Sequence, residues 1–163
     1  MALLTKKRRA WLLVALAALL AYLALPFPFL SSRSRVDIQE ASIRWLLRHN
    51  HSALQNRLQV CYVGLGKTFD PDDKDFSPLA PPPDFLKRFA DLPVPVYAVG
   101  SRDGAGKKGL SVSAGDVQRW SIGLVRCRGL YFEGSLSSAA YDIYMLRLPF
   151  TWLPFGAKTR WLS

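Results

Sequence analysis

Two glycine–lysine pairs in the sequence could each belong to a phosphate-binding loop. Gly66-Lys67-Thr68 follows a strand-like run, and Gly106-Lys107 lies in a polar loop. A phosphate-binding loop needs a further glycine five positions before the pair, where this chain has Cys61 and Ser101. Both pairs are therefore predicted to be turns, and no nucleotide or other cofactor is expected.

Acidic side chains and histidines are the next candidates, as metal ligands. Lys74 and Asp75 occupy positions where the helix–loop–helix calcium pattern needs an oxygen ligand and a glycine, so an acidic surface loop is predicted. His49 and His51 are two residues apart and would not share a helical face, so no metal site is expected. The clustered aspartates are Asp70, Asp72, Asp73 and Asp75.

A catalytic set is not evident in the residues either. Two histidines and no Gly-x-Ser-x-Gly sequence leave little for nucleophilic catalysis. Glu133 and Asp142 lie on adjacent predicted strands around a Gly134-Ser135 turn, where they are predicted to face solvent. No catalytic residue is therefore assigned.

Cys61 and Cys127 are the two cysteines, and each lies in an alternating, strand-like run. In an oxidising compartment such a pair can close one disulfide, which is worth about 2 to 4 kcal/mol. The alternative is two buried free thiols that behave as small apolar residues.

The compartment is predicted by the N-terminal sequence. Residues from Ala10 to Ser32 carry no charge, and they follow Lys6, Lys7, Arg8 and Arg9. As a helix this run would be about 35 Å long, which is enough to cross a hydrocarbon core of about 30 Å. The sequence therefore predicts an anchor domain (1–32) with a cytoplasmic N-terminus, a lipid bilayer as the partner of residues 10–32, and a domain (33–163) outside the cytoplasm.

A cleaved secretory signal is the rival interpretation of the same segment, because a basic start and an apolar core are also typical of signal peptides. Cleavage needs small residues just beyond the core. Ala15 and Ala17 lie inside the core, while Ser32 and Ser34 come late and next to arginines. The uncleaved anchor is therefore preferred.

The formal net charge is +10, and part of it belongs to the N-terminal segment. The remaining arginines are scattered rather than interleaved with aromatic residues, so nucleic acid is not expected as a partner.

Residues 33–163 are predicted to form one α+β domain. An amphipathic helix is predicted from Ser34 to His49, then a strand over 57–65, a long loop to Pro83, a short helix over 84–91 and a strand near 94–99. Further strands are predicted over 110–112, 117–121, 124–133, 139–148 and 158–162 as an antiparallel meander. The expected fold is therefore a transmembrane helix followed by one helix packed on a curved antiparallel sheet.

An uncharged stretch from Leu148 to Ala157 interrupts the last strands. Its large apolar residues are predicted to complete the core. The alternative is a hairpin tip that contacts a membrane surface or a partner protein. These possible interface residues are Phe150, Trp152, Leu153 and Phe155.

The C-terminal third resembles the ending of small exported bacterial domains of uncharacterised families. The resemblance is carried by Trp120, Tyr131, Gly134, Leu136, Tyr141 and Trp161. The layout is also similar to cystatin-like and NTF2-like domains, which implies a helix on a bent sheet. Neither resemblance implies a role for a particular residue.

These features together favour a non-enzymatic, membrane-anchored interaction module of the cell envelope, with an envelope protein as partner. The alternative is a small exported enzyme or ligand-pocket protein released by cleavage of the signal peptide. A sheet closed around a cavity would favour that alternative.

Overall fold

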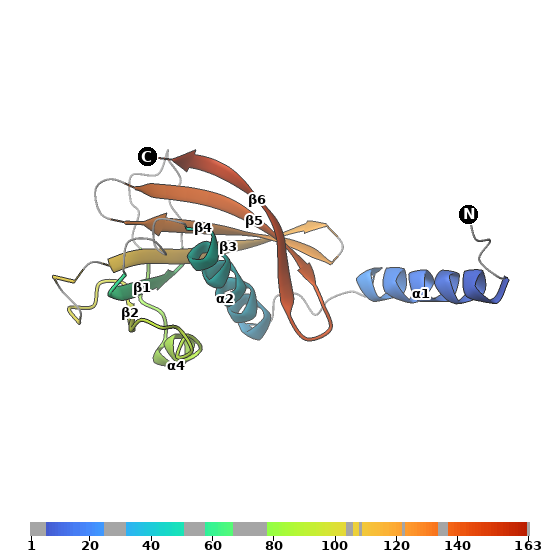
Figure 1. Ribbon diagram of the computed structural model, residues 1–163, viewed down its shortest axis with the longest axis horizontal. Coiled ribbons are helices and arrows are strands. Elements are labelled where there is room, and N and C mark those ends of the chain that lie inside the picture. Colours follow the sequence, from blue (N-terminus) through green and yellow to red (C-terminus); the bar gives the residue numbers. More distant parts are fainter. Residues whose placement is uncertain are drawn as a thin grey trace.

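The structure of the chain is a computed structural model that describes residues 6–24, 32–50, 58–66, 78–103, 106–107, 109–121, 123–133 and 137–162. Its helices are α1 (Lys6–Ala24), α2 (Ser32–His49) and α4 (Pro83–Lys87). Its strands are β1 (Val60–Leu65), β2 (Val96–Ala98), β3 (Gly109–Ser121), β4 (Leu124–Phe132), β5 (Ser138–Arg147) and β6 (Trp152–Leu162). In Figure 1, α2 lies across one face of the sheet and α1 extends away from it.

The described strands form one six-stranded sheet with the order β2-β1-β3-β4-β5-β6. β1 runs parallel to both β2 and β3, whereas β3 to β6 form an antiparallel meander. The prediction of a purely antiparallel sheet is therefore wrong. Alternation of apolar residues indicates which side of a strand is buried, but it does not fix the direction of the neighbouring strand.

The core lies between α2 and one face of this sheet. Ile38, Ile43 and Leu46 of α2 are at most 1 % exposed and pack against apolar residues of β1, β3, β4 and β5. Their spacings of five and three residues place them within one broad arc of the helix, as its amphipathic pattern predicts. Truncating any of them to alanine would cost about 2 to 5 kcal/mol.

The prediction of a transmembrane helix is also wrong. Among the described residues, no helix is both long enough and apolar enough to cross a membrane. α1 starts with four basic residues and ends at Ala24. Its uncharged part, residues 10–24, is therefore about 22 Å long, short of the roughly 30 Å that a crossing requires. Residues 25–31 of the predicted span lie outside the described residues.

The prediction of a disulfide is also wrong, because neither Cys61 nor Cys127 forms one and both are fully buried. Cys61 lies beside Leu110 of β3, whereas Cys127 lies beside Val117 of the same strand. That offset along β3 separates the two cysteines by about 20 Å or more at roughly 3.3 Å per residue. A disulfide needs Cα atoms within about 7 Å. The two residues are the buried thiols of the alternative interpretation.

Burial raises the pKa of the Cys61 thiol to about 12. The Cys127 Sγ donates a hydrogen bond to the Gly115 backbone oxygen at 3.2 Å. Both thiols therefore act as parts of the packed core.

Candidate functional site

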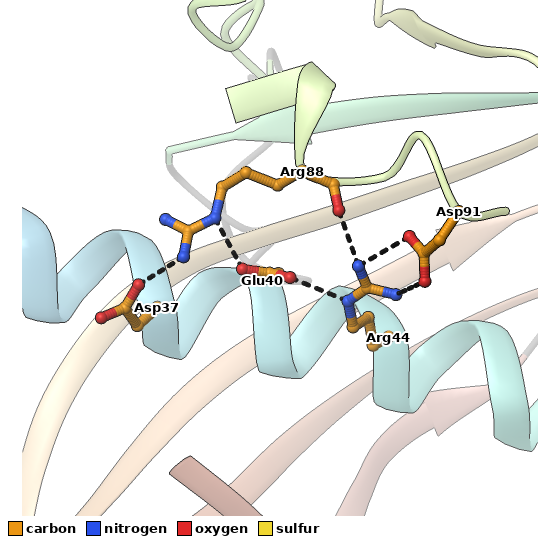
Figure 2. Close-up of polar contacts among 5 residues, drawn as sticks. All are labelled: Asp37, Glu40, Arg44, Arg88 and Asp91. Atoms are coloured by element: carbon orange, nitrogen blue, oxygen red, sulfur yellow. Dashed lines mark hydrogen bonds and ion pairs between the residues drawn. The ribbon is translucent and has the colours of Figure 1, made fainter. Parts of the chain in front are cut away.

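The outward side of α2 carries a row of charged residues that reaches across to α4. Glu40 Oε1 accepts from Arg44 Nε at 2.8 Å, and Glu40 Oε2 pairs with Arg88 Nε at 2.6 Å. Arg88 Nη2 also donates to Asp37 Oδ1 at 2.5 Å. Figure 2 shows that Arg88, at the C-terminal end of α4, bridges two carboxylates one helical turn apart on α2.

Arg44 completes this network from the other direction. Its two terminal nitrogens each donate to one oxygen of Asp91 at 2.9 Å, and Nη2 also donates to the Arg88 backbone oxygen at 2.6 Å (Figure 2). The hydrogen bonds between Arg44 and Asp91 raise the pKa of Arg44 and lower the pKa of Asp91. The guanidinium carbon also lies 5.3 Å from the centre of the Phe89 ring. The segment after α4 is thus fixed to α2.

An open groove lies between this charged side of α2 and the segment that enters β6. Its volume is about 760 Å³. We call it the α2–β6 groove, and it is lined by residues of two kinds. The first wall is mostly polar and consists of Asp37, Glu40, Ala41, Arg44, Trp45, Arg48, His49 and Arg88. The second wall is mostly apolar and consists of residues 150–156.

The apolar wall contains all four residues named as a possible interface, but in different environments. Trp152 is partly buried and packs against the core. Phe150 is fully exposed, Leu153 is 47 % exposed and Phe155 is 55 % exposed. We call Phe150, Leu153 and Phe155 the apolar tip. The prediction that this stretch completes the core therefore describes Trp152 and not the tip.

The turn before β6 explains why the tip stays outside. Leu148 N donates to Thr151 O at 2.8 Å, which closes a tight turn and directs Phe150 into solvent. Phe155 lies beside Tyr144, with ring centres 6.5 Å apart. Apolar residues of this size that stay exposed together mark interaction surfaces in soluble domains.

Trp45 lies on the α2 side of the groove. It stacks on His49 with ring centres 4.2 Å apart, and its edge meets Tyr141 of β5 at 5.5 Å. His49 Nδ1 lies 2.9 Å from the Trp45 backbone oxygen. His49 is therefore held by its own helix, and His51 lies outside the described residues.

The other sequence candidates do not come together at this groove. Asp142 is fully buried and lies opposite Arg128 of β4, whereas Glu133 lies at the β4–β5 turn. The prediction that both residues face solvent is therefore wrong for Asp142. Lys107 is exposed in its turn. The four clustered aspartates and Lys67-Thr68 lie outside the described residues. No group of three metal-ligating side chains occurs within the part of the chain that the structure describes.

The arrangement supports binding more than bond-breaking chemistry. The carboxylates of the groove are engaged by arginines, and its apolar wall carries no ionisable group. Sequence reasoning missed the groove because Arg88 and Asp91 are distant from α2 along the chain. The detectable signal was the row of charges on α2, which faces away from the core.

Comparison with protein-family models, with curated proteins and with solved structures finds no match to this chain. The resemblance to exported bacterial domains therefore stays a prediction.

Proposed function

We propose that the protein is a non-enzymatic interaction module that binds a protein partner in the α2–β6 groove. The observation that carries this proposal is the apolar tip, in which a fully exposed Phe150 stands with two half-exposed apolar residues along one wall. Burying such residues against a partner is favourable by about 25 cal/mol for each Å² removed from water.

The charges around the groove favour an acidic partner. Arg44 and Arg88 are already paired with Asp37, Glu40 and Asp91, so Arg48 is the lining arginine that lies outside these ion pairs, and the whole chain has a formal net charge of +10. Opposite charges across an interface steer the encounter and fix the register of the two partners. The partner segment is therefore expected to place apolar side chains against the tip and carboxylates near Arg48.

The ion pairs of α2 hold one wall of the groove in a fixed conformation. Because Arg88 and Arg44 already tie the α4 segment to α2, this wall needs no rearrangement when a partner arrives. A pre-organised surface loses less conformational entropy on association.

Site-specific photo-crosslinking in cells tests this proposal. A photoreactive amino acid is placed at Phe150 or at Leu153 of the full-length chain, and at Leu79 as a control that is 68 % exposed elsewhere. We expect one discrete adduct from both tip positions and none from Leu79. The adduct should disappear when Arg48→Glu reverses the charge at the groove.

Equal adducts from Leu79 and the tip, or no adduct from the tip, would contradict the proposal. An adduct that contains only lipid would assign the tip to a membrane surface and reject a protein partner. Contact of residues 10–32 with a lipid bilayer and a location outside the cytoplasm both stay predictions, as does the alternative of a small exported enzyme.

A further inference from the structure

The exposed apolar surface at the end of the β5–β6 hairpin continues onto the sheet face opposite α2, which we call the far face. Met145 of β5 is fully buried in the core with residues of α2, so the next residue, Leu146, points to the far face. Leu146 lies directly opposite Leu124 of β4 and Leu153 of β6. Directly opposite residues share a face of the sheet. Three leucines from three adjacent strands therefore form one row on the far face.

Two aromatic side chains extend this row. Tyr144 precedes Leu146 by two residues and so points to the same face, and its ring centre lies 6.5 Å from that of Phe155. Leu153 and Phe155 are half-exposed, and the other members are partly exposed. We call this set the far-face strip. It consists of Leu124, Tyr144, Leu146, Leu153 and Phe155.

The end of the hairpin thus presents apolar residues in more than one direction. Phe150 is fully exposed in the turn, and Trp152 packs toward the core and lines the α2–β6 groove, whereas the far-face strip lies on the other side of the sheet. Figure 1 shows that the turn between β5 and β6 projects from the body of the sheet. A partner segment that lay only in the groove would leave the far-face strip in water. The groove alone therefore does not account for the exposed apolar residues.

Basic side chains lie on both sides of the hairpin end. Arg48 lines the groove on the α2 side. Lys158 lies opposite Asp142 of β5, so its exposed side chain is on the far face. Asp142 is fully buried, and residues 143–163 contain no aspartate or glutamate. A partner with acidic residues would therefore find complementary charge on both sides of the hairpin.

We propose that the partner of the α2–β6 groove is a protein with an apolar cleft that receives the end of the β5–β6 hairpin and covers both of its faces. This inference rests on the proposed function and specifies the shape and chemistry of the partner. The cleft places apolar residues around Phe150 and acidic residues on its two rims, near Arg48 and Lys158. A projecting aromatic residue that fills a pocket is typical of the centre of a tight interface. Asp37 and Glu40 line the same groove, so a protein fits it better than an anionic lipid surface does.

Photo-crosslinking in cells from both faces of the hairpin tests this inference. A photoreactive amino acid is placed in the full-length chain at Phe150 in the turn, at His49 in the groove, or at Leu124 on the far face. Mass spectrometry then identifies the crosslinked peptides. We expect adducts from all three positions with one and the same protein. The peptides captured at His49 and Leu124 should come from different segments of that protein, because a cleft has two walls.

A charge reversal on the far face gives a second readout. Lys158→Glu should lower the yield of the Phe150 adduct by about ten-fold, because it places a like charge against the acidic rim of the cleft. Lys107→Glu is the matched control, since Lys107 is exposed in the turn before β3, and it should leave the yield unchanged. The melting temperatures of both variants show whether they fold. If Lys158→Glu does not fold, the Leu124 adduct still tests contact with the far face.

The outcomes separate this inference from the proposed function. Adducts from Phe150 and His49 without one from Leu124 would overturn the enclosing cleft and leave a protein partner in the groove. The absence of an adduct from Phe150 would overturn both. Lipid adducts, crosslinks to a second copy of this chain, or different proteins on the two faces would each contradict the enclosing cleft. An equal loss of yield in Lys158→Glu and Lys107→Glu would contradict it as well.

Discussion

Phe150 and Trp152 are two residues apart and yet have opposite environments. The tight turn ends at Thr151, so Trp152 starts β6 and packs against the core, while Phe150 stays in water. Both are aromatic residues in one uncharged stretch, so composition cannot separate them. The difference arises from the turn geometry, which the sequence pattern does not specify.

Asp142 is a second residue whose environment depends on distant positions. It is fully buried because arginines from β4 and β6 converge on it. A buried carboxylate without such partners would be strongly destabilising. The alternation of residues along β5 alone does not reveal a charge cluster assembled from three strands.

Cys61 makes stability depend on pH in a predictable direction. Its thiol has a pKa of about 12 in the folded chain, against an ordinary value near 9. Between these values the unfolded chain releases the proton and the folded chain keeps it, so the free energy of unfolding falls as pH rises. The expected slope is about 1.4 kcal/mol for each pH unit above 9.

Chemical denaturation from pH 8 to pH 10.5 measures this slope. Cys61→Ala removes the thiol and should give a shallower decline, whatever its stability at pH 8. Identical slopes in the two proteins would show that the thiol does not titrate as the fold implies.

At the scale of elements, the sequence predicted helices and strands correctly where the local residue pattern is sufficient to determine them. The helix predicted over 34–49 corresponds to α2, and the strands predicted over 124–133 and 139–148 correspond to β4 and β5. The runs predicted over 110–112 and 117–121 form one strand, β3, with a register shift between Gly115 and Val117. A bulge of this kind looks like a break in the alternation.

The parallel placement of β1 depends on a glycine contact. Gly66 N donates to the Ala114 backbone oxygen at 3.2 Å, and a Cβ built on Gly115 would lie 1.3 Å from the Gly66 oxygen. We therefore expect Gly115→Ala to force β1 and β3 apart and to lower the free energy of unfolding by about 2 kcal/mol or more.

Gly156 provides the matched control, because nothing lies within 4 Å of a Cβ built there. Gly156→Ala should change the free energy of unfolding by less than about 0.5 kcal/mol. Urea denaturation of both variants measures the difference. Equal stability of Gly115→Ala and the unchanged chain would contradict the described contact between β1 and β3.

β6 lies at one edge of the sheet and carries features that discourage pairing with another strand. Pro154 lacks a backbone donor, Lys158 adds a charge, and two register shifts interrupt its pairing with β5. Such devices protect edge strands from unwanted association. A partner is therefore expected at the groove beside the tip rather than along the open edge of β6.

The whole molecule presents two distinct surfaces on opposite sides of one sheet. The α2 side carries the α2–β6 groove with its mixed apolar and charged walls. The opposite side carries Asp142 and the arginines around it, and Leu153 and Phe155 reach this side because they lie opposite Leu146 and beside Tyr144. The exposed residues of the groove are not required by the core, so they are available for binding while the sheet holds them in fixed positions.

A comparison of tip and core variants tests the central claim that the apolar tip is a binding surface. The full-length double variant Phe150→Asp with Leu153→Asp removes the exposed tip, and Trp152→Ala serves as the core control. We predict that the double variant keeps its melting temperature within about 2 °C and loses the partner adduct formed by a photoreactive residue at Phe155. Trp152→Ala should lower the melting temperature clearly. A double variant that unfolds like Trp152→Ala, or that still forms the adduct, would contradict the account.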